Sequence, residues 1–127
     1  MAAKLLAAFG YQGDALNLPV AEADASAAFY VATMGFAEVE RGDEPVKRVV
    51  IERNGVRMGL AENGGDSEQD GCAFHTDDVA ALREELLASG AGKVGEIKSE
   101  TRPDGSEFDA FFVIAPDGLC FWFGEKK

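Results

Sequence analysis

The sequence predicts an α+β fold in which two tandem βαβββ units form curved mixed sheets around a cavity. Two observations support this prediction. The order of patterns in residues 15–62 returns in residues 71–125: a short strand, an amphipathic helix, a glycine and further strands. Both units also close with a strand opened by Asn-Gly or Asp-Gly, in N-G-V-R-M-G-L-A-E and D-G-L-C-F-W-F-G-E. A working site is expected between two such copies.

The first unit is expected at about 14–62. Residues 15–20 alternate between two sets of side chains with period two, which is typical of a strand with one apolar face. A helix should follow, capped by Asp24 or Ser26 and ended by Gly35. The other strands of this unit are expected at 37–41, 46–53 and 56–62, with the Asn54-Gly55 pair as a hairpin turn between the last two.

The second unit is expected at about 71–125, after a polar, Gly-rich linker at about 63–70. It begins with a strand at 71–76 and a helix from about Asp78 to Ser89. Its remaining strands are expected near 93–100, 108–114 and 119–124. The first ten residues predict a short helix or an additional strand, because they are too weakly apolar for a secretory signal.

Bulk properties exclude several classes of function. The chain has 127 residues, of which 46% are hydrophobic, as expected for one globular domain covering 1–127. No run approaches the roughly 20 apolar residues of a membrane span. The net charge of −11 argues against a nucleic-acid partner, because phosphate contacts need a basic surface. This charge would attract a cationic ligand, or it serves solubility alone.

The two cysteines, Cys72 and Cys120, fall on different expected strands and have no Cys-x-x-Cys spacing. They are interpreted as reduced, buried thiols of a cytoplasmic protein.

Three motifs, in this order, resemble the vicinal oxygen chelate superfamily. They are F-Y-x-x-x-M-G-F at 29–36, D-D-V-x-A-L at 77–82 and A-P-D-G-x-x-F-W-F at 115–123. The superfamily includes glyoxalase I, extradiol dioxygenases, fosfomycin-resistance enzymes and bleomycin-resistance proteins. The resemblance covers about residues 14–125. It implies a U-shaped cavity between the paired units and, for a chain of this length, a homodimer.

The resemblance also implies where a metal would be held: at the start of the first strand and in the middle of the last strand of each unit. In this chain those four positions are Ala15, Gly59, Gly71 and Trp122. None of these side chains can bind a divalent ion, which needs imidazole or carboxylate ligands. The sequence therefore predicts no metal, no cofactor and no catalytic residue at the usual site, and argues against an enzyme.

Five residues are the candidate ligand-binding set on the cavity face. Trp122 would form a stacking wall for a planar ligand, or it fills the core. His75 would orient a ligand or act as a base, or it is structural. Arg57 would hold an anion or is a solvated strand residue, and Asn17 would offer an amide or cap a strand. Cys120 is interpreted as packing rather than as a nucleophile.

The expected function is that of a metal-free protein, similar to the bleomycin-resistance branch, that binds a small aromatic or cationic molecule. The alternative is a glyoxalase-like lyase or dioxygenase with a displaced metal site, in which His75 joins Glu22, Asp117 or Glu125. A scaffold role with the cavity filled by aromatic side chains is a third possibility. The polar loop at 101–107 would overhang the cavity as a lid or simply connect strands.

Overall fold

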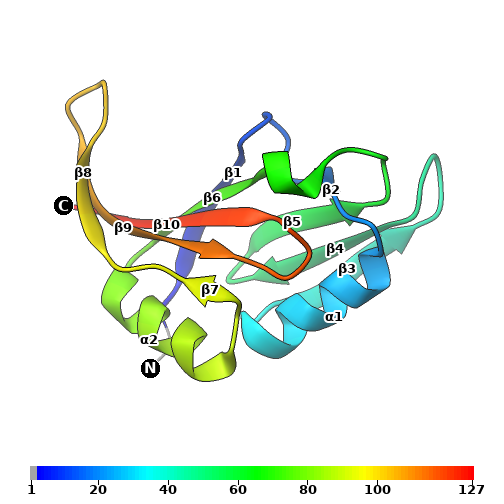
Figure 1. Ribbon diagram of the computed structural model, residues 1–127, viewed down its shortest axis with the longest axis horizontal. Helices are drawn as coiled ribbons and strands as arrows, with labels where there is room; N and C mark the ends of the chain where they lie inside the picture. The colour runs from blue at the N-terminus through cyan, green and yellow to red at the C-terminus, as the bar shows by residue number, and fades with distance from the viewer. Residues whose placement is uncertain (1–2) are drawn as a thin grey trace.

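The computed structural model describes residues 3–127 and confirms the predicted fold class. Two mixed sheets stand side by side, with both α-helices on the same side of the molecule (Figure 1). No helix formed by residues 3–127 is long and apolar enough to cross a membrane.

The first unit forms a four-stranded sheet in the order β2-β5-β4-β3, called sheet B here. Its elements are β2 (Leu18–Pro19), α1 (Ala23–Thr33), β3 (Ala37–Gly42), β4 (Arg48–Arg53) and β5 (Val56–Ala61). Asn54 and Gly55 both have positive φ, 55° and 80°, which is the backbone that a tight two-residue hairpin requires. This turn holds β4 and β5 in antiparallel register.

The second unit forms the larger sheet A, in the order β1-β6-β10-β9-β7, with β8 also paired to β9. Its elements are β6 (Gly71–Thr76), α2 (Val79–Ser89), β7 (Lys93–Val94), β8 (Lys98–Thr101), β9 (Glu107–Ile114) and β10 (Cys120–Lys126). The N-terminal strand β1 (Leu5–Gly10) pairs antiparallel with β6, so the expected additional strand belongs to this sheet. A short 3-10 helix, η1 (Ser67–Gln69), lies in the linker.

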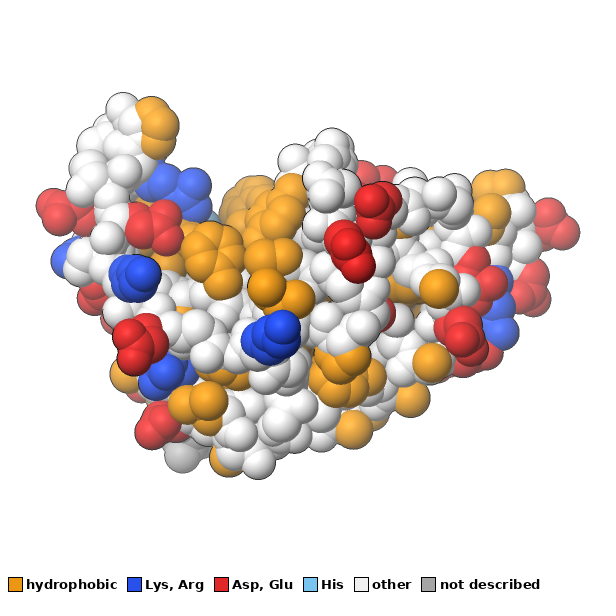
Figure 2. All heavy atoms as spheres, viewed as in Figure 1, with side chains coloured by type: hydrophobic (Ala, Val, Ile, Leu, Met, Phe, Trp, Pro, Cys, Tyr) orange, Lys and Arg blue, Asp and Glu red, His pale blue; other side chains and the backbone are white. Residues whose placement is uncertain are grey.

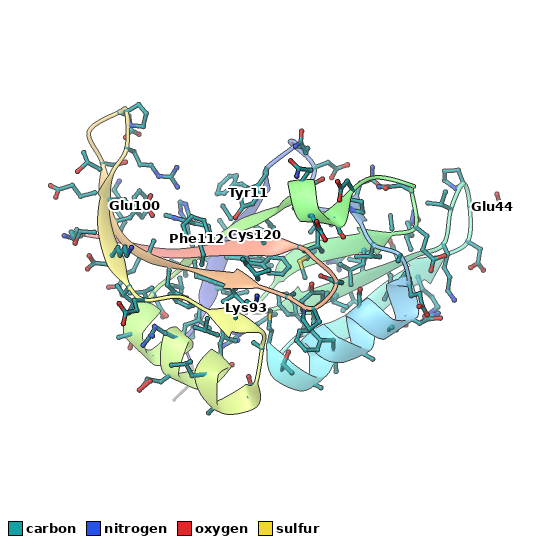
Figure 3. All side chains as sticks on the ribbon, in the orientation of Figure 1. Tyr11, Glu44, Lys93, Glu100, Phe112 and Cys120 are labelled. Carbon is teal, nitrogen blue, oxygen red and sulfur yellow. The ribbon has the colours of Figure 1, made fainter. Side chains whose placement is uncertain are left out.

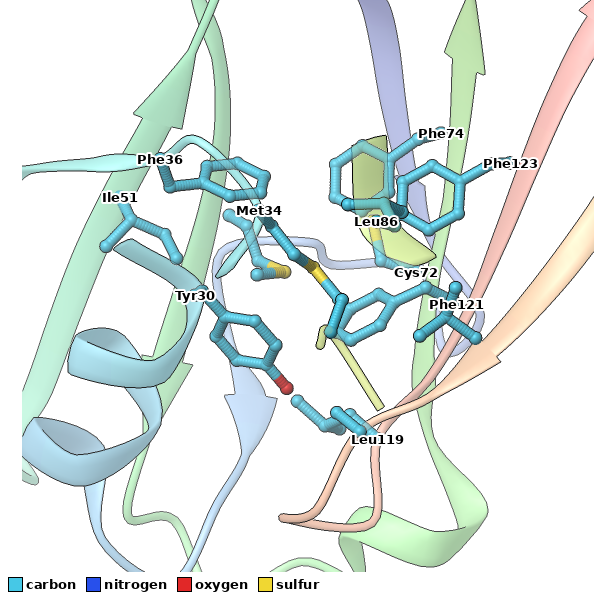
Figure 4. Packing of buried hydrophobic residues seen from close by; sticks show 14 of the residues in the cluster. Tyr30, Met34, Phe36, Ile51, Cys72, Phe74, Leu86, Leu119, Phe121 and Phe123 are labelled. Atoms are coloured by element: carbon cyan, nitrogen blue, oxygen red, sulfur yellow. The ribbon is translucent and has the colours of Figure 1, made fainter. Parts of the chain in front are cut away.

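One hydrophobic core lies between the sheets and the helices and draws on both units (Figure 4). Its largest fully buried side chains are Tyr30, Phe74, Phe111, Phe121, Phe123, Leu18, Met34, Ile51, Met58, Leu60, Leu82 and Leu86. Along β10, Phe121 and Phe123 belong to this core, whereas Trp122 belongs to a separate small cluster. The period-two alternation of a strand places Trp122 on the opposite face, away from the helices.

Three sequence predictions need correction. The expected strand at 15–20 is reduced to β2 (Leu18–Pro19), because residues 14–17 form a turn in which the Asn17 N–H donates to the Asp14 carbonyl at 3.2 Å. Helix α1 begins at Ala23, with Glu22 rather than Asp24 or Ser26 in the N-cap position, and Glu22 makes no side-chain cap bond. The expected strand at 93–100 is two short strands, because residues 95–97 leave the ladder between the segments that pair with β9. A carboxylate distant in sequence supplies the missing cap.

The same helix-capping contact is present in both units. Glu62 Oε2 accepts a hydrogen bond from the backbone N–H of Ala23 at 2.9 Å, at the start of α1. Glu125 Oε1 accepts from the N–H of Val79 at 2.8 Å, at the start of α2. These glutamates end the two repeated sequences N-G-V-R-M-G-L-A-E and D-G-L-C-F-W-F-G-E. In each unit, a glutamate at the end of the last strand therefore accepts a hydrogen bond from the first N–H group of the unit's own helix.

Two of the sequence motifs also meet in space. Tyr30 Oη donates to Asp117 Oδ2 at 2.7 Å, and Ser26 Oγ donates to the same oxygen at 2.8 Å. Burial, together with the neighbouring Asp117 carboxylate, raises the pKa of Tyr30. The Pro-Asp-Gly turn thus has a role that the sequence did not indicate: it ties β10 of one unit to α1 of the other.

Candidate functional site

The candidate site lies on the open face of sheet A, the face that points away from the helices. Strand register sets Trp122 between Ala73 on β6 and Phe112 on β9, and sets Phe9 of β1 beside Ala73. Figure 3 shows Tyr11 and Phe112 on this side of the strands. The face is therefore lined largely by aromatic side chains from four strands and from the residue after β1.

The Trp122 ring lies flat against the sheet at the centre of this face. A Cβ built on Gly124 would lie 2.1 Å from Trp122 Cη2, so the indole occupies the space above this glycine. Its Nε1 donates to Glu100 Oε2 at 2.9 Å, and Arg102 Cζ lies 4.5 Å from the ring centroid. As a result Trp122 is only 4% exposed, although it lies on the face of sheet A that points away from the helices.

His75 belongs to the same aromatic cluster. Its ring centroid lies 5.3 Å from that of Phe9, 5.2 Å from that of Phe108 and 5.8 Å from that of Trp122. Burial lowers the pKa of His75, and the positive charges of Arg102 and Lys126 lower it further. The imidazole is therefore neutral at pH 7 and can both donate and accept a hydrogen bond.

Two hollows include residues of the same face, although His75, Phe108 and Trp122 line neither of them. One, of about 290 Å³, lies between β8 and β9 and is lined by Gly95, Glu96, Lys98, Ser99, Glu100, Ala110 and Phe112. The other, of about 660 Å³, is lined by Glu68, Gly92, Lys93, Ile114, Ala115, Pro116, Gly118 and Cys120. Figure 2 shows hydrophobic side chains gathered in the hollow beside the upright β8–β9 loop. Both hollows are open, so the single chain does not enclose a ligand.

Cys120 lies on this face, and its surroundings support the interpretation as packing. Burial raises the pKa of the Cys120 thiol, so it is protonated at neutral pH and is not an activated nucleophile. Cys72, on the neighbouring strand, is buried among core residues, and burial raises its pKa to about 12. Both cysteines are free thiols, as the sequence predicted, but only Cys72 is buried as expected, and Cys120 is partly exposed.

The other two candidate residues lie elsewhere. Asn17 accepts a hydrogen bond from Asn63 Nδ2 at 3.1 Å, and both residues line a separate polar hollow of about 310 Å³. Arg57 lies on sheet B, where its Nε donates to Glu52 Oε1 at 2.9 Å. The structure therefore brings together Trp122, His75 and Cys120 on one face and separates Asn17 and Arg57 from them.

Two of the positions at which the superfamily holds a metal have no space for any side chain. A Cβ at Gly59 would lie 2.2 Å from the carbonyl oxygen of Leu16, and a Cβ at Gly71 would lie 1.7 Å from that of Cys120. Ala15, at a third position, packs against the core. In residues 3–127, no group of three or more His, Cys, Asp or Glu side chains is arranged to hold a metal ion.

The displaced metal site is not favoured either, because two of its three carboxylates have other roles. Asp117 accepts hydrogen bonds from α1, and Glu125 accepts one at the start of α2. The Glu22 carboxylate makes no cap bond at the start of α1, and within residues 3–127 it is not grouped with His75 in a cluster that could hold a metal. The neighbours of His75 are aromatic rings and two cationic side chains, which do not bind a divalent cation.

Sequence reasoning missed four members of the site: Phe9, Glu100, Arg102 and Phe108. A signal existed for Phe108, because period-two alternation along the expected strand at 108–114 puts it on the same face as Phe112. Phe9 could not have been found, since the partner of an additional N-terminal strand is not encoded in its own pattern. Arg102 appeared only as part of a polar loop.

Comparison with known proteins is consistent with this geometry. A family model described as a glyoxalase-like domain matches residues 15–111. The chain belongs to the glyoxalase-like domain family. No curated protein matches this glyoxalase-like protein in sequence.

Solved structures share its fold at low sequence identity. A glyoxalase/bleomycin resistance protein/dioxygenase from Alicyclobacillus acidocaldarius is 17% identical, with a TM-score of 0.68, over 87% of this chain and 88% of that one. A bleomycin resistance determinant encoded on transposon Tn5 is 21% identical, with a TM-score of 0.65, over 87% and 94%. TnmS3, an antibiotic-binding protein from Streptomyces sp. CB03234, is 19% identical, with a TM-score of 0.68, over 87% and 92%. At these identities the likeness shows the fold alone.

Proposed function

We propose that this glyoxalase-like protein binds a small aromatic or cationic molecule on the open face of sheet A, without a metal and without catalysis. The observation that carries the proposal is Trp122, an indole at a position where a metal-using relative would need a carboxylate. It lies in a cluster with His75 and Phe108, and Phe112 and Cys120 of the same face each line an open hollow. Aromatic walls with a few polar groups are typical of sites for planar organic ligands.

Two further facts support this proposal. The bleomycin resistance determinant and the antibiotic-binding protein TnmS3 have the same fold, and their names describe ligand binding or resistance rather than a reaction. The net charge of −11 would draw organic cations toward the surface.

The protein is proposed to work as a homodimer. Four large apolar side chains of the open face are about half exposed: Phe9 at 56%, Tyr11 at 43%, Phe112 at 48% and Ile114 at 48%. Such a patch on a small protein marks a surface that another molecule covers. A second copy placed there would also close the open hollows around a ligand. Light scattering should give about twice 13.5 kDa at micromolar concentration, and the monomer mass would refute the dimer.

The free thiols Cys72 and Cys120 suit a reducing compartment, so a cytoplasmic location is proposed with the function.

The binding site can be tested directly, because the chain has one Trp and one His and both lie in the cluster. In ¹H–¹⁵N spectra, a panel of planar neutral and cationic compounds should shift the single indole signal of Trp122 together with the signals of His75. Phe112→Ala should weaken binding by roughly tenfold, since one aromatic contact is lost. Val39→Ala, on the exposed edge of sheet B, is the matched control and should change nothing.

Two results would refute the proposal. The first is a panel in which no compound shifts Trp122 or His75 at millimolar concentration. The second is a thermal shift of several degrees on addition of Ni²⁺, Zn²⁺, Mn²⁺ or Fe²⁺ that is lost in His75→Gln, since this would restore the metal-dependent alternative.

A further inference from the structure

The outer face of the Trp122 ring is covered by a side chain of the protein itself. Arg102 follows β8, and its Cζ lies 4.5 Å from the centroid of Trp122 and 5.5 Å from that of Phe108. The inner face of the indole lies over Gly124. The ring is thus held between the sheet and a planar guanidinium, which is the geometry of a cation–π contact.

The backbone that carries Arg102 is firmly held. The Arg102 N–H donates to the carbonyl of Ser106 at 2.8 Å, and the N–H of Gly105 donates to the carbonyl of Arg102 at 2.9 Å. Asp104 Oδ1 accepts from both the N–H and the hydroxyl of Ser106. The β8–β9 loop is therefore a stiff turn rather than a hinged lid, and only the side chain of Arg102 can leave the ring.

Leaving the ring would break no ion pair with the residues that the structure describes. Arg41, Arg53 and Arg57 each have a carboxylate partner, but the ion pairs formed within residues 3–127 include none to Arg102. Arg102 is also partly exposed, so its guanidinium can be hydrated as soon as it moves outward. What it would lose is mainly its contact with the two rings.

The space that Arg102 occupies suits a positive charge. The face of the indole is electron-rich, and the Phe108 ring stands at 70° to it as a second wall. Glu100 places a carboxylate at the indole edge through its 2.9 Å contact with Nε1. Arg102 stacks on the Trp122 ring even though Lys126 places a second positive charge near His75, so the site accepts a cation despite this repulsion.

We propose that Arg102 is an internal ligand of the Trp122–Phe108 site and that a planar organic cation binds there by taking its place. This inference rests on the proposed function and narrows its ligand class from aromatic or cationic molecules to planar cations. A guest with both a positive charge and a flat aromatic surface would replace the guanidinium contact and add stacking area. Phe112, about half exposed beside Trp122, would extend that surface.

The test compares three probes and three variants. N-methylquinolinium is the planar cation, quinoline its neutral counterpart at pH 7.5, and 1-naphthoate the planar anion. Arg102→Met keeps an unbranched apolar stem but removes the charge and the planar group, and Arg102→Lys keeps the charge without the planar group. Arg57→Met on sheet B is the matched control. Affinity is measured by calorimetry, and the site is identified from the Trp122 indole signal.

Without any probe, Arg102→Met should raise the pKa of His75, and it should increase acrylamide quenching of Trp122 at least twofold. With probes, it should tighten N-methylquinolinium binding by roughly five- to tenfold, because the guest no longer competes with a bound guanidinium. The affinity for quinoline should rise by less than half of that factor. The affinity of Arg102→Lys for N-methylquinolinium should lie between those of the wild type and Arg102→Met. Arg57→Met should match the wild type throughout.

Several outcomes would overturn the inference while leaving the proposed function in place. Unchanged Trp122 quenching in Arg102→Met would show that Arg102 does not cover the ring. Equal gains in affinity for quinoline and N-methylquinolinium in Arg102→Met would show that Arg102 blocks the ring sterically and that its charge plays no part. Tighter binding of 1-naphthoate than of the cation, lost in Arg102→Met, would make it an anion anchor. If no compound shifts Trp122 in any variant, the proposed function itself fails.

Discussion

The open faces of the two sheets differ far more than their helix-covered faces do. On sheet A, the register across β10 and β9 pairs Trp122 with Phe112. On sheet B, the register across β4 and β5 pairs Gly59 with Val50 and Arg57 with Glu52. Ala15 accepts a hydrogen bond from the N–H of Gly59 at 2.8 Å, so the chain's own preceding segment lies against that strand.

This comparison separates what folds the chain from what binds a ligand. Both units keep the apolar helix-facing side chains, the tight turn before the last strand and the glutamate that caps the helix. Only sheet A carries an aromatic open face. A duplicated unit can lose ligand-binding groups from one copy without losing its fold, because the two sets of side chains point in opposite directions from the same strands.

The largest loss of stability is expected at Gly59 and Gly71, where backbone atoms occupy the space that a side chain would need. Gly71→Ala and Gly59→Ala should each lower the free energy of unfolding by about 3 kcal/mol or more, because the new methyl group meets a carbonyl that cannot move freely. Gly42→Ala on β3 is the control, since its Cβ would lie 3.5 Å from the nearest side-chain atom. Urea denaturation measures all three. Losses at Gly59 and Gly71 as small as the control's would mean that these positions can accept a side chain, and the metal-site argument would weaken.

The next effect concerns the link between the units. Tyr30→Phe should lower the free energy of unfolding by about 1–2 kcal/mol, and Asp117→Ala by more, because it leaves the buried Tyr30 hydroxyl without its acceptor. The double variant should lose clearly less than the sum of the two single losses. Additive losses would show that the hydrogen bond does not hold the units together. Asp43→Ala, at an exposed carboxylate between β3 and β4, is the matched control.

These contacts also show how far the sequence could be read. The duplication, the strand parity and the Trp122 position follow from local patterns, since period-two alternation decides which face a side chain takes. The Tyr30–Asp117 bond and the Glu62 and Glu125 caps could not be derived, because each joins residues 39 or more positions apart. The position of Asn17 was misjudged for a related reason: β2 is only two residues long, so parity does not extend back to that residue.

The helix caps test whether the two units are equivalent. Glu62→Ala and Glu125→Ala should each lower the free energy of unfolding by about 1 kcal/mol, the usual value of an N-terminal carboxylate interaction. Glu84→Ala on the exposed side of α2 should have almost no effect. Thermal unfolding at low and high salt measures the losses, which should shrink with salt. A loss confined to one of the two glutamates would show that the repeated sequence has kept its role in only one unit.

The smallest effect is a pH dependence that belongs to sheet A alone. In the folded chain, burial and the charges of Arg102 and Lys126 lower the pKa of His75 below its ordinary value. As pH falls past about 6.5, the unfolded chain therefore takes up its proton first, and the folded state loses stability until the folded-state pKa is passed. The urea midpoint of the wild type should fall relative to that of His75→Gln over this interval and stay level above pH 7.5. Arg102→Met should reduce this difference but not abolish it, because burial is the larger cause and remains. A difference that grows as pH rises would mean that His75 gains a negative partner on the open face, contrary to the aromatic and cationic surroundings described for it.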